Sequence, residues 1–244
     1  MEQPILDLKQ LVVDGRVFRS PYDVQRVEAF IPRMGLENHA ANLLELPNGD
    51  MLCVWFAGTM EGVSDINVAL SRLSVGSSQW SQPVWVSQDP TRSEQNPVLF
   101  LTPDGELWLL YTAQEAGEAT GEAWNQRASG DAWRQWTAVI RRRISYDLGR
   151  TWGPVEVFSE APGSFCRNPM VVLDNGDWLF PMYYSVNAPG HGDDYSVVRI
   201  STDRGATWQE YPVPESHGRV HPSVIDLKRG QLVAFFRSRA ADHI

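Results

Sequence analysis

Cysteine, basic residues and long apolar runs are all scarce in this sequence. Its 244 residues include two cysteines, Cys53 and Cys166, which lie in unrelated contexts without the spacing of metal ligands. We interpret both as reduced thiols. No run approaches the roughly twenty apolar residues that a membrane-spanning helix requires. The sequence therefore predicts no metal, no other cofactor and no membrane partner.

Positive charge is also limited, because 21 Lys and Arg residues oppose 30 Asp and Glu residues and give a formal net charge of −9. A nucleic-acid-binding protein normally carries a basic surface, so this class is disfavoured. The first twenty residues lack the basic start, apolar centre and small-residue cleavage site of a signal peptide. We therefore expect no nucleic-acid partner and a cytoplasmic location.

The residues that are abundant favour an all-β protein. The sequence has ten Trp, nineteen Gly and sixteen Pro, and 43% of its residues are hydrophobic, yet it contains no long segment with helical periodicity. This length and apolar content suffice for one large domain or two small ones.

A repeated unit accounts for most of the chain. Each copy contains a polar pair, an apolar strand, a turn with glycine and a second apolar strand. The copies begin at Asn38, Gln95, Arg167 and Arg219, and their turn glycines are Gly49, Gly105, Gly176 and Gly230. The glycines are 54 to 71 residues apart, which is close to the length of one four-stranded propeller blade.

A shorter pattern, Ser-x-Asp-x-Gly-x-Thr-Trp, occurs in "ISYDLGRTW" and in "ISTDRGATW". In both copies it follows the third expected strand of a unit. Asp147 and Asp203 can accept hydrogen bonds from backbone N–H groups of their own turns, while the tryptophan packs under the sheet. We interpret the pattern as a turn clamp; the alternative is a catalytic or calcium site.

The pattern resembles the Asp box, or bacterial neuraminidase repeat, and its place between third and fourth strands matches the sialidase-like β-propellers. The resemblance implies an all-β fold of four-stranded blades, with about four of six blades within residues 36–244. Residues 1–35 are interpreted as an N-terminal segment, for which a closing strand of the propeller is one role. We expect a fragment or truncated product whose open blade edge favours self-association.

The polar pairs mark the candidate site, because the first strands of propeller blades line a central channel. We expect them to converge at one mouth rather than to serve only as satisfied structural residues. The candidate substrate-binding residues are Asn38, Asn96, Arg167, Asn168, Tyr184 and Arg237. The Glu115–Trp136 segment lengthens the second unit and is interpreted either as a plain surface excursion or as a flap over the mouth.

Comparison with the active site of sialidases implies further roles. Their acid/base aspartate corresponds to Glu61 or Asp65 in "AGTMEGVSDINV", and the second arginine of their carboxylate clamp corresponds to Arg237. The first arginine of the clamp is missing, since Asn38 and His39 stand in its place. His221 replaces the glutamate that activates the nucleophile.

The leading hypothesis is a glycoside hydrolase acting on glycans that contain sialic or uronic acid. Glu61 or Asp65 protonates the leaving oxygen, Arg237 holds the carboxylate, and a nucleophile beyond residue 244 completes the reaction.

Two alternatives remain open. In a polysaccharide lyase, His39 or His221 removes the proton α to a uronate carboxylate, and Tyr183 or Tyr184 protonates the departing oxygen. In a sugar-binding propeller, the same mouth binds an acidic glycan without turnover.

Overall fold

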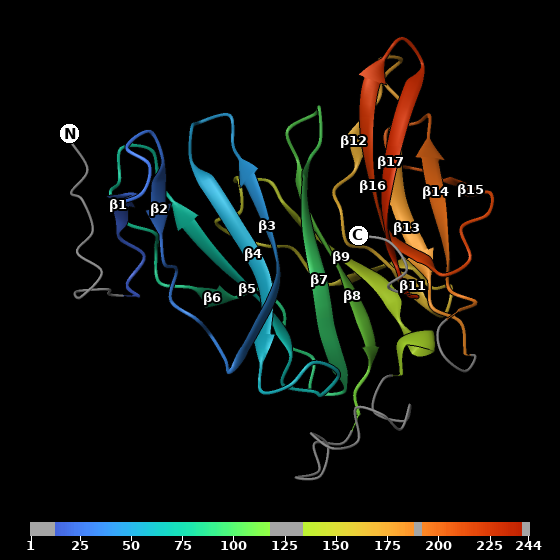
Figure 1. The fold of residues 1–244 in the computed structure, drawn as a ribbon, viewed down its shortest axis with the longest axis horizontal. Coiled ribbons are helices and arrows are strands. Elements are labelled where there is room, and N and C mark those ends of the chain that lie inside the picture. The colour runs from blue at the N-terminus through green and yellow to red at the C-terminus, as the bar shows by residue number, and fades with distance from the viewer. Residues whose placement is uncertain (1–12, 118–133, 188–191, 241–244) are drawn as a thin grey trace.

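The computed structural model describes residues 13–117, 134–187 and 192–240, and these residues form an all-β fold. Most of the Glu115–Trp136 segment lies outside the described residues. Two four-stranded antiparallel sheets, one five-stranded sheet and the two-stranded C-terminal sheet follow one another along the chain and stand side by side (Figure 1). We number them blades 1 to 4.

Each blade follows the order of its strands in the sequence, from the inner strand outward. Blade 1 consists of β3 (Glu37–Glu45), β4 (Met51–Gly58), β5 (Asn67–Leu73) and β6 (Val84–Trp85). Blade 2 consists of β7 (Arg92–Leu101), β8 (Leu107–Glu115), β9 (Val139–Ser145) and β10 (Glu156–Ser159), with a short 3₁₀ helix (Gln135–Thr137) before β9.

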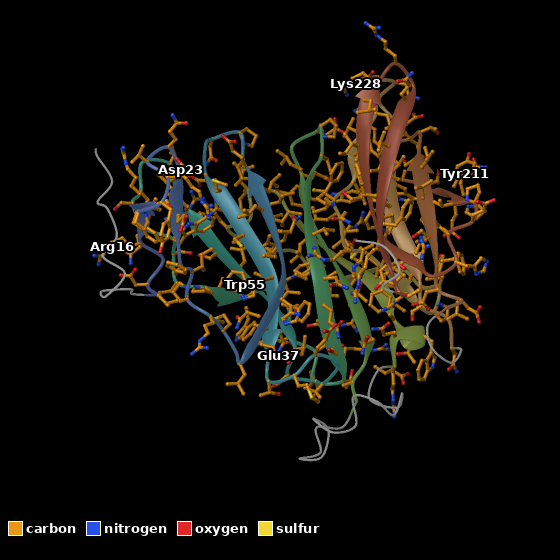
Figure 2. All side chains as sticks on the ribbon, viewed as in Figure 1. Arg16, Asp23, Glu37, Trp55, Tyr211 and Lys228 are labelled. Atoms are coloured by element: carbon orange, nitrogen blue, oxygen red, sulfur yellow. The ribbon has the colours of Figure 1, made fainter. Side chains whose placement is uncertain are left out.

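Blade 3 has an inner strand in two pieces, both paired with the second strand. It consists of β11 (Ser164–Phe165), β12 (Val171–Val172), β13 (Trp178–Tyr184), β14 (Tyr195–Ser201) and β15 (Gln209–Pro212). Blade 4 consists of β16 (Arg219–Lys228) and β17 (Gln231–Ser238). Figure 2 shows Lys228, at the β16–β17 turn, and Glu37, at the start of β3, near opposite ends of the array.

The first hairpin of each unit turns where the sequence predicts. Gly49, Gly105 and Gly176 have φ values of 83°, 93° and 87°, which residues with a Cβ rarely adopt. Each of the three glycines follows an Asn or Asp residue, as is typical of tight hairpins. The inner two strands of blades 1 to 3 are therefore determined by local turn chemistry.

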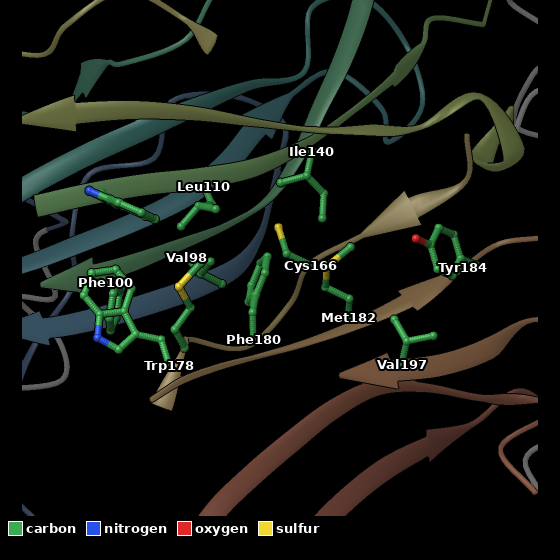
Figure 3. Packing of buried hydrophobic residues seen from close by; sticks show 12 residues of the cluster. Val98, Phe100, Leu110, Ile140, Cys166, Trp178, Phe180, Met182, Tyr184 and Val197 are labelled. Carbon is green, nitrogen blue, oxygen red and sulfur yellow. The ribbon is translucent and has the colours of Figure 1, made fainter. Parts of the chain in front are cut away.

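The core lies between the blades because alternate residues of a strand face opposite neighbours. In β8, Leu107 and Leu109 pack toward blade 1, whereas Trp108 and Leu110 pack toward blade 3. Trp178 of blade 3 meets Phe100 edge-on, with ring centroids 5.0 Å apart (Figure 3). Trp178 also meets Trp108 edge-on, with ring centroids 5.5 Å apart. Burying each such side chain contributes about 1.5–3 kcal/mol, so the stacked blades stabilise one another.

The N-terminal residues form a separate hairpin of β1 (Val17–Arg19) and β2 (Val27–Ala29). The N–H of Val17 donates to the Ser78 carbonyl (2.8 Å), and Val17 packs with Trp55 and Trp80. This hairpin therefore covers the face of blade 1 that is turned away from blade 2.

Blade 4 presents apolar side chains to solvent. Ile225 and Phe235 are 48% and 61% exposed and lie on the same face of the two-stranded sheet, and Leu227, at the register shift next to the turn, is 54% exposed. Self-association through this open face stays a prediction.

The Asp boxes have the internal hydrogen bonds that the sequence predicts. Asp147 accepts bonds from the backbone N–H (2.8 Å) and hydroxyl (2.6 Å) of Thr151, and Ser145 donates to the same carboxylate (2.8 Å). Asp203 accepts equivalent bonds in its own turn. These bonds, with those from Thr hydroxyls foremost, lower the pKa of Asp147 and bring the pKa of Asp203 to about 2. Both carboxylates therefore act within their turns.

We predict that Asp203→Ala lowers the melting temperature at neutral pH. We also expect the melting temperature of this variant to fall less than that of the wild type as the pH drops from 4 to 2. Because the folded-state pKa is about 2, below the ordinary value of 3.8, ionised Asp203 stabilises the fold above about pH 4. That stabilisation is lost as the pH falls toward 2. Thermal melts at pH 7 and between pH 4 and 2 measure both effects. The exposed carboxylate variant Glu160→Ala is the control, and equal melting curves for the two variants contradict the prediction.

Candidate functional site

The inner strands are irregular at their polar pairs. Three of them contain a β-bulge in which one extra residue enters the strand. The register shifts lie between His39 and Asn42, between Gln95 and Val98, and between Val220 and Ser223. Each bulge holds a residue with positive φ: Ala40 (57°), Asn96 (50°) and His221 (55°). In blade 3 the inner strand is interrupted between β11 and β12 instead.

These irregularities determine which way the polar side chains face. An extra residue in a strand reverses the inward and outward alternation, since side chains alternate with a period of two. The apolar residues that follow the bulge in an inner strand can thus pack between blades, while the polar residues that precede it line a common space. Left-handed conformations at alanine and histidine cost about 1–3 kcal/mol each and are typical of functional sites.

The common space is a pocket of about 290 Å³ that receives side chains from all four blades. Residues from inner strands make up much of its wall, together with residues from β4, β13, β17 and the loops beside them. The pocket is lined by His39, Ala40, Phe56, Glu61, Gln95, Asn96, Gln135, Phe165, Arg167, Tyr183, His221, Arg237 and Arg239.

Three guanidinium groups, those of Arg167, Arg237 and Arg239, give one side of the pocket its charge. Arg239 forms an ion pair with the buried Asp194 carboxylate through Nη2 (2.7 Å) and also donates to it from Nε (2.9 Å). Its Nη2 donates to Oε1 of Gln135 as well (3.0 Å). Within the described ranges, Arg167 and Arg237 form no ion pair, so they are the groups available to a carboxylate.

His221 and Tyr183 meet edge-on in the wall of the pocket, with ring centroids 5.2 Å apart. Burial, followed by the charges of the three arginines, lowers the pKa of His221 to about 3. Burial also raises the pKa of Tyr183, which is stacked on Phe165 with centroids 4.9 Å apart. At neutral pH the pair therefore consists of an uncharged imidazole and a protonated phenol.

Glu61 reaches the pocket from the loop between β4 and β5, which several hydrogen bonds hold in place. Its backbone N–H donates to the Glu37 carboxylate (2.7 Å), and the Gly62 N–H donates to the Ser93 hydroxyl (3.2 Å). The Asp65 carboxylate accepts from the Thr59 N–H (3.1 and 3.2 Å). Asp65 thus holds this loop and borders a different pocket.

The structure brings together seven of the predicted site residues in this pocket: His39, Glu61, Asn96, Arg167, Tyr183, His221 and Arg237. Four others lie outside its lining. Besides Asp65, these are Asn38, Asn168 and Tyr184.

The side chains of these last three have partners elsewhere. Asn38 accepts from the indole N–H of Trp55 (3.0 Å), and Asn168 donates to the His221 carbonyl (3.1 Å). The Tyr184 hydroxyl donates to Glu210 (2.7 Å) on the side of β13 opposite Tyr183.

Sequence reasoning missed Arg239, Gln135 and Phe165. The spacing of Arg237 and Arg239 in "FRSR" was a usable signal, because residues two apart in a strand share a face. Gln135 lies 104 residues from Arg239 and carries no local signal for their contact.

Within the part of the chain that the structure describes, no group of three or more His, Cys, Asp and Glu residues could hold a metal ion. Among the same residues, no helix is long and apolar enough to span a membrane.

We predict that Asp194→Ala lowers the free energy of unfolding by about 3 kcal/mol, because it leaves the largely enclosed Arg239 guanidinium, 14% exposed, without its buried counter-charge. Urea denaturation of the chain measures the change. Asp193→Ala is the matched control, since Asp193 is exposed and adjacent in sequence. Wild-type stability of the Asp194 variant contradicts the prediction.

Comparison with solved structures places this fold among the sialidases. The chain is similar to the Hadza microbial sialidase Hz136, with 14% identity, a TM-score of 0.66, and coverage of 84% of this chain and 42% of that chain. The NanB sialidase from Streptococcus pneumoniae is 14% identical with a TM-score of 0.63, and the match covers 90% of this chain and 52% of that chain. The intramolecular trans-sialidase from Ruminococcus gnavus is 15% identical with a TM-score of 0.62, and the match covers 83% of this chain and 66% of that chain.

The fold is therefore that of a sialidase-like β-propeller, as the sequence predicts, and the chain spans 42% to 66% of the length of these three proteins. Residues 49–244 match the model of the BNR repeat-like domain. The chain belongs to this family. No curated protein matches the sequence.

Proposed function

We propose that this chain binds a carboxylate-bearing sugar in the central pocket and that the protein hydrolyses its glycosidic bond. The observation that carries the proposal is the convergence of Arg167, Arg237 and Glu61 on one pocket. Two guanidinium groups without an ion-pair partner in the described structure suit a carboxylate, which can accept two parallel hydrogen bonds from each. Sialic and uronic acids supply such a group.

Glu61 acts as the proton donor in this proposal. Its carboxyl O–H protonates the glycosidic oxygen while the bond from that oxygen to the anomeric carbon breaks. Water supplies the hydroxyl that the anomeric carbon gains, and its remaining proton restores Glu61. The hydrogen bond from the Glu61 N–H to Glu37 keeps the loop at the pocket. The sialidase names of the structural neighbours support this reaction class.

We expect Glu61→Gln to slow hydrolysis by about 100-fold or more for a methyl glycoside of sialic or glucuronic acid. The same variant should slow the nitrophenyl glycoside much less, because nitrophenolate departs with little protonation. Initial rates with the two substrates measure this difference, and calorimetry checks that binding persists. Glu160→Gln is the control. Equal rate losses for both leaving groups contradict the role of Glu61.

A uronate lyase is the second candidate, and the His221–Tyr183 contact favours it. His221 takes the proton from the carbon α to the carboxylate, and that electron pair forms a carbon–carbon double bond. The C–O bond at the β carbon then breaks, and the Tyr183 hydroxyl gives its proton to the leaving oxygen. The raised pKa of Tyr183 keeps this proton in place until the bond breaks.

The pKa of His221 gives this candidate a distinctive pH profile. If His221 is the base, activity should persist from pH 7 down to about pH 4, because the imidazole is protonated only near pH 3. The growth of ultraviolet absorbance from the unsaturated uronate measures the rate, and His221→Gln should abolish it. An acid limb near pH 6.5 contradicts the assignment of His221, and a saturated product contradicts the lyase reaction.

A further inference from the structure

Gln95 is a pocket residue whose hydrogen bonding is incomplete in the described structure. Its side chain lines the pocket and is only 1% exposed. Its Nε2 donates to the Ser93 hydroxyl (2.9 Å), but its Oε1 has no hydrogen-bond partner in the described structure. A buried amide oxygen without a donor is unfavourable, and most such atoms in folded proteins are paired. This atom thus marks a place where a ligand can supply a donor.

The bulge in β7 keeps this side chain at the pocket wall. Gln95 pairs with Thr112 just before the register shift, and Asn96 within the bulge has a φ of 50°. The Cys166 thiol donates to the Asn96 carbonyl (3.4 Å), which ties the bulge to blade 3. The terminal torsion of a glutamine side chain is broad, so the amide can still turn to meet a ligand.

The charged donors of the pocket lie on one side. Blades 3 and 4 contribute the guanidinium groups of Arg167, Arg237 and Arg239, whereas blades 1 and 2 contribute the carboxyl and amide oxygens of Glu61 and Gln95, together with His39 and Asn96. A ligand that satisfies both sides has an anionic end and a hydroxyl-bearing edge opposite it. A simple carboxylic acid offers only the first.

We propose that Gln95 is a specificity-determining residue that accepts a hydrogen bond from a ring hydroxyl of the bound sugar acid. The carboxylate then faces blades 3 and 4 and the hydroxyl edge faces blades 1 and 2. The inference rests on the proposed function, since it concerns the same site and names the part of the substrate that this site selects. Sites built to bond a substrate hydroxyl strongly reject analogues that lack it.

The test measures the dissociation constants of sialic acid, glucuronic acid and all monodeoxy derivatives of the acid that binds, using calorimetry. With the wild-type chain, one deoxy derivative should bind about 10-fold more weakly than its parent. With Gln95→Leu, the same pair should differ by less than about 3-fold, because the acceptor is absent. Gln95→Glu retains acceptor oxygens and should retain the preference.

Three controls make the outcomes distinct. Gln209→Leu, at an exposed position in β15, should keep wild-type discrimination. Arg237→Lys should weaken parent and derivative by the same factor, because it alters the carboxylate contact alone. Thermal melts verify that each Gln95 variant is folded. If Gln95→Leu does not fold, the hydroxyl preference of Gln95→Glu alone tests the inference.

If Gln95→Leu keeps the full hydroxyl preference, or folded Gln95→Glu loses it, the inference is overturned while the proposed function stands. If neither acid binds the wild-type chain, the proposed function fails and this inference fails with it.

Discussion

Hydrogen bonds between neighbouring inner strands, at or next to their irregular segments, hold the site together. The side chain of Asn42 accepts from the Leu99 N–H (3.0 Å) and joins blade 1 to blade 2. The Cys166 thiol joins blade 3 to blade 2, and Asn168 joins blade 3 to the His221 carbonyl of blade 4. The bulges interrupt the regular backbone pairing within a blade. These contacts between blades therefore provide hydrogen-bond partners for polar groups that the strand pairing leaves unsatisfied. The pocket geometry therefore depends on how the blades are stacked.

The charge of the site is local and opposes that of the whole chain. The formal net charge is −9, yet the pocket gathers Arg167, Arg237 and Arg239 around neutral His221. Charges further apart than a Debye length, about 8 Å at physiological salt, are largely screened. The surface of the protein thus gives an anionic sugar little long-range attraction, and its binding must come from direct contacts. Asp194 offsets one guanidinium and leaves two for those contacts.

The fold could be predicted from the sequence because its determinants are local. Asn-Gly and Asp-Gly turns specify the hairpins, and the Asp boxes bind their own backbone within a few residues. Many site residues could be predicted too, since the polar pairs repeat in phase with the hairpins. The contacts of Arg239 with Gln135 and Asp194 could not, because they join segments 104 and 45 residues apart that share no pattern.

Tyr183 and Tyr184 show what a repeat pattern leaves undetermined. Adjacent residues in a strand face opposite ways, so only one of them can lie in the pocket, but which one depends on the register of β13. β11 fixes that register by pairing Phe165 with Tyr183. Tyr184 then joins the core between blades 2 and 3, where burial raises its pKa to about 12. A residue's chemistry in this fold is therefore decided by the inner strand beside it, and that strand is where the repeat is least regular.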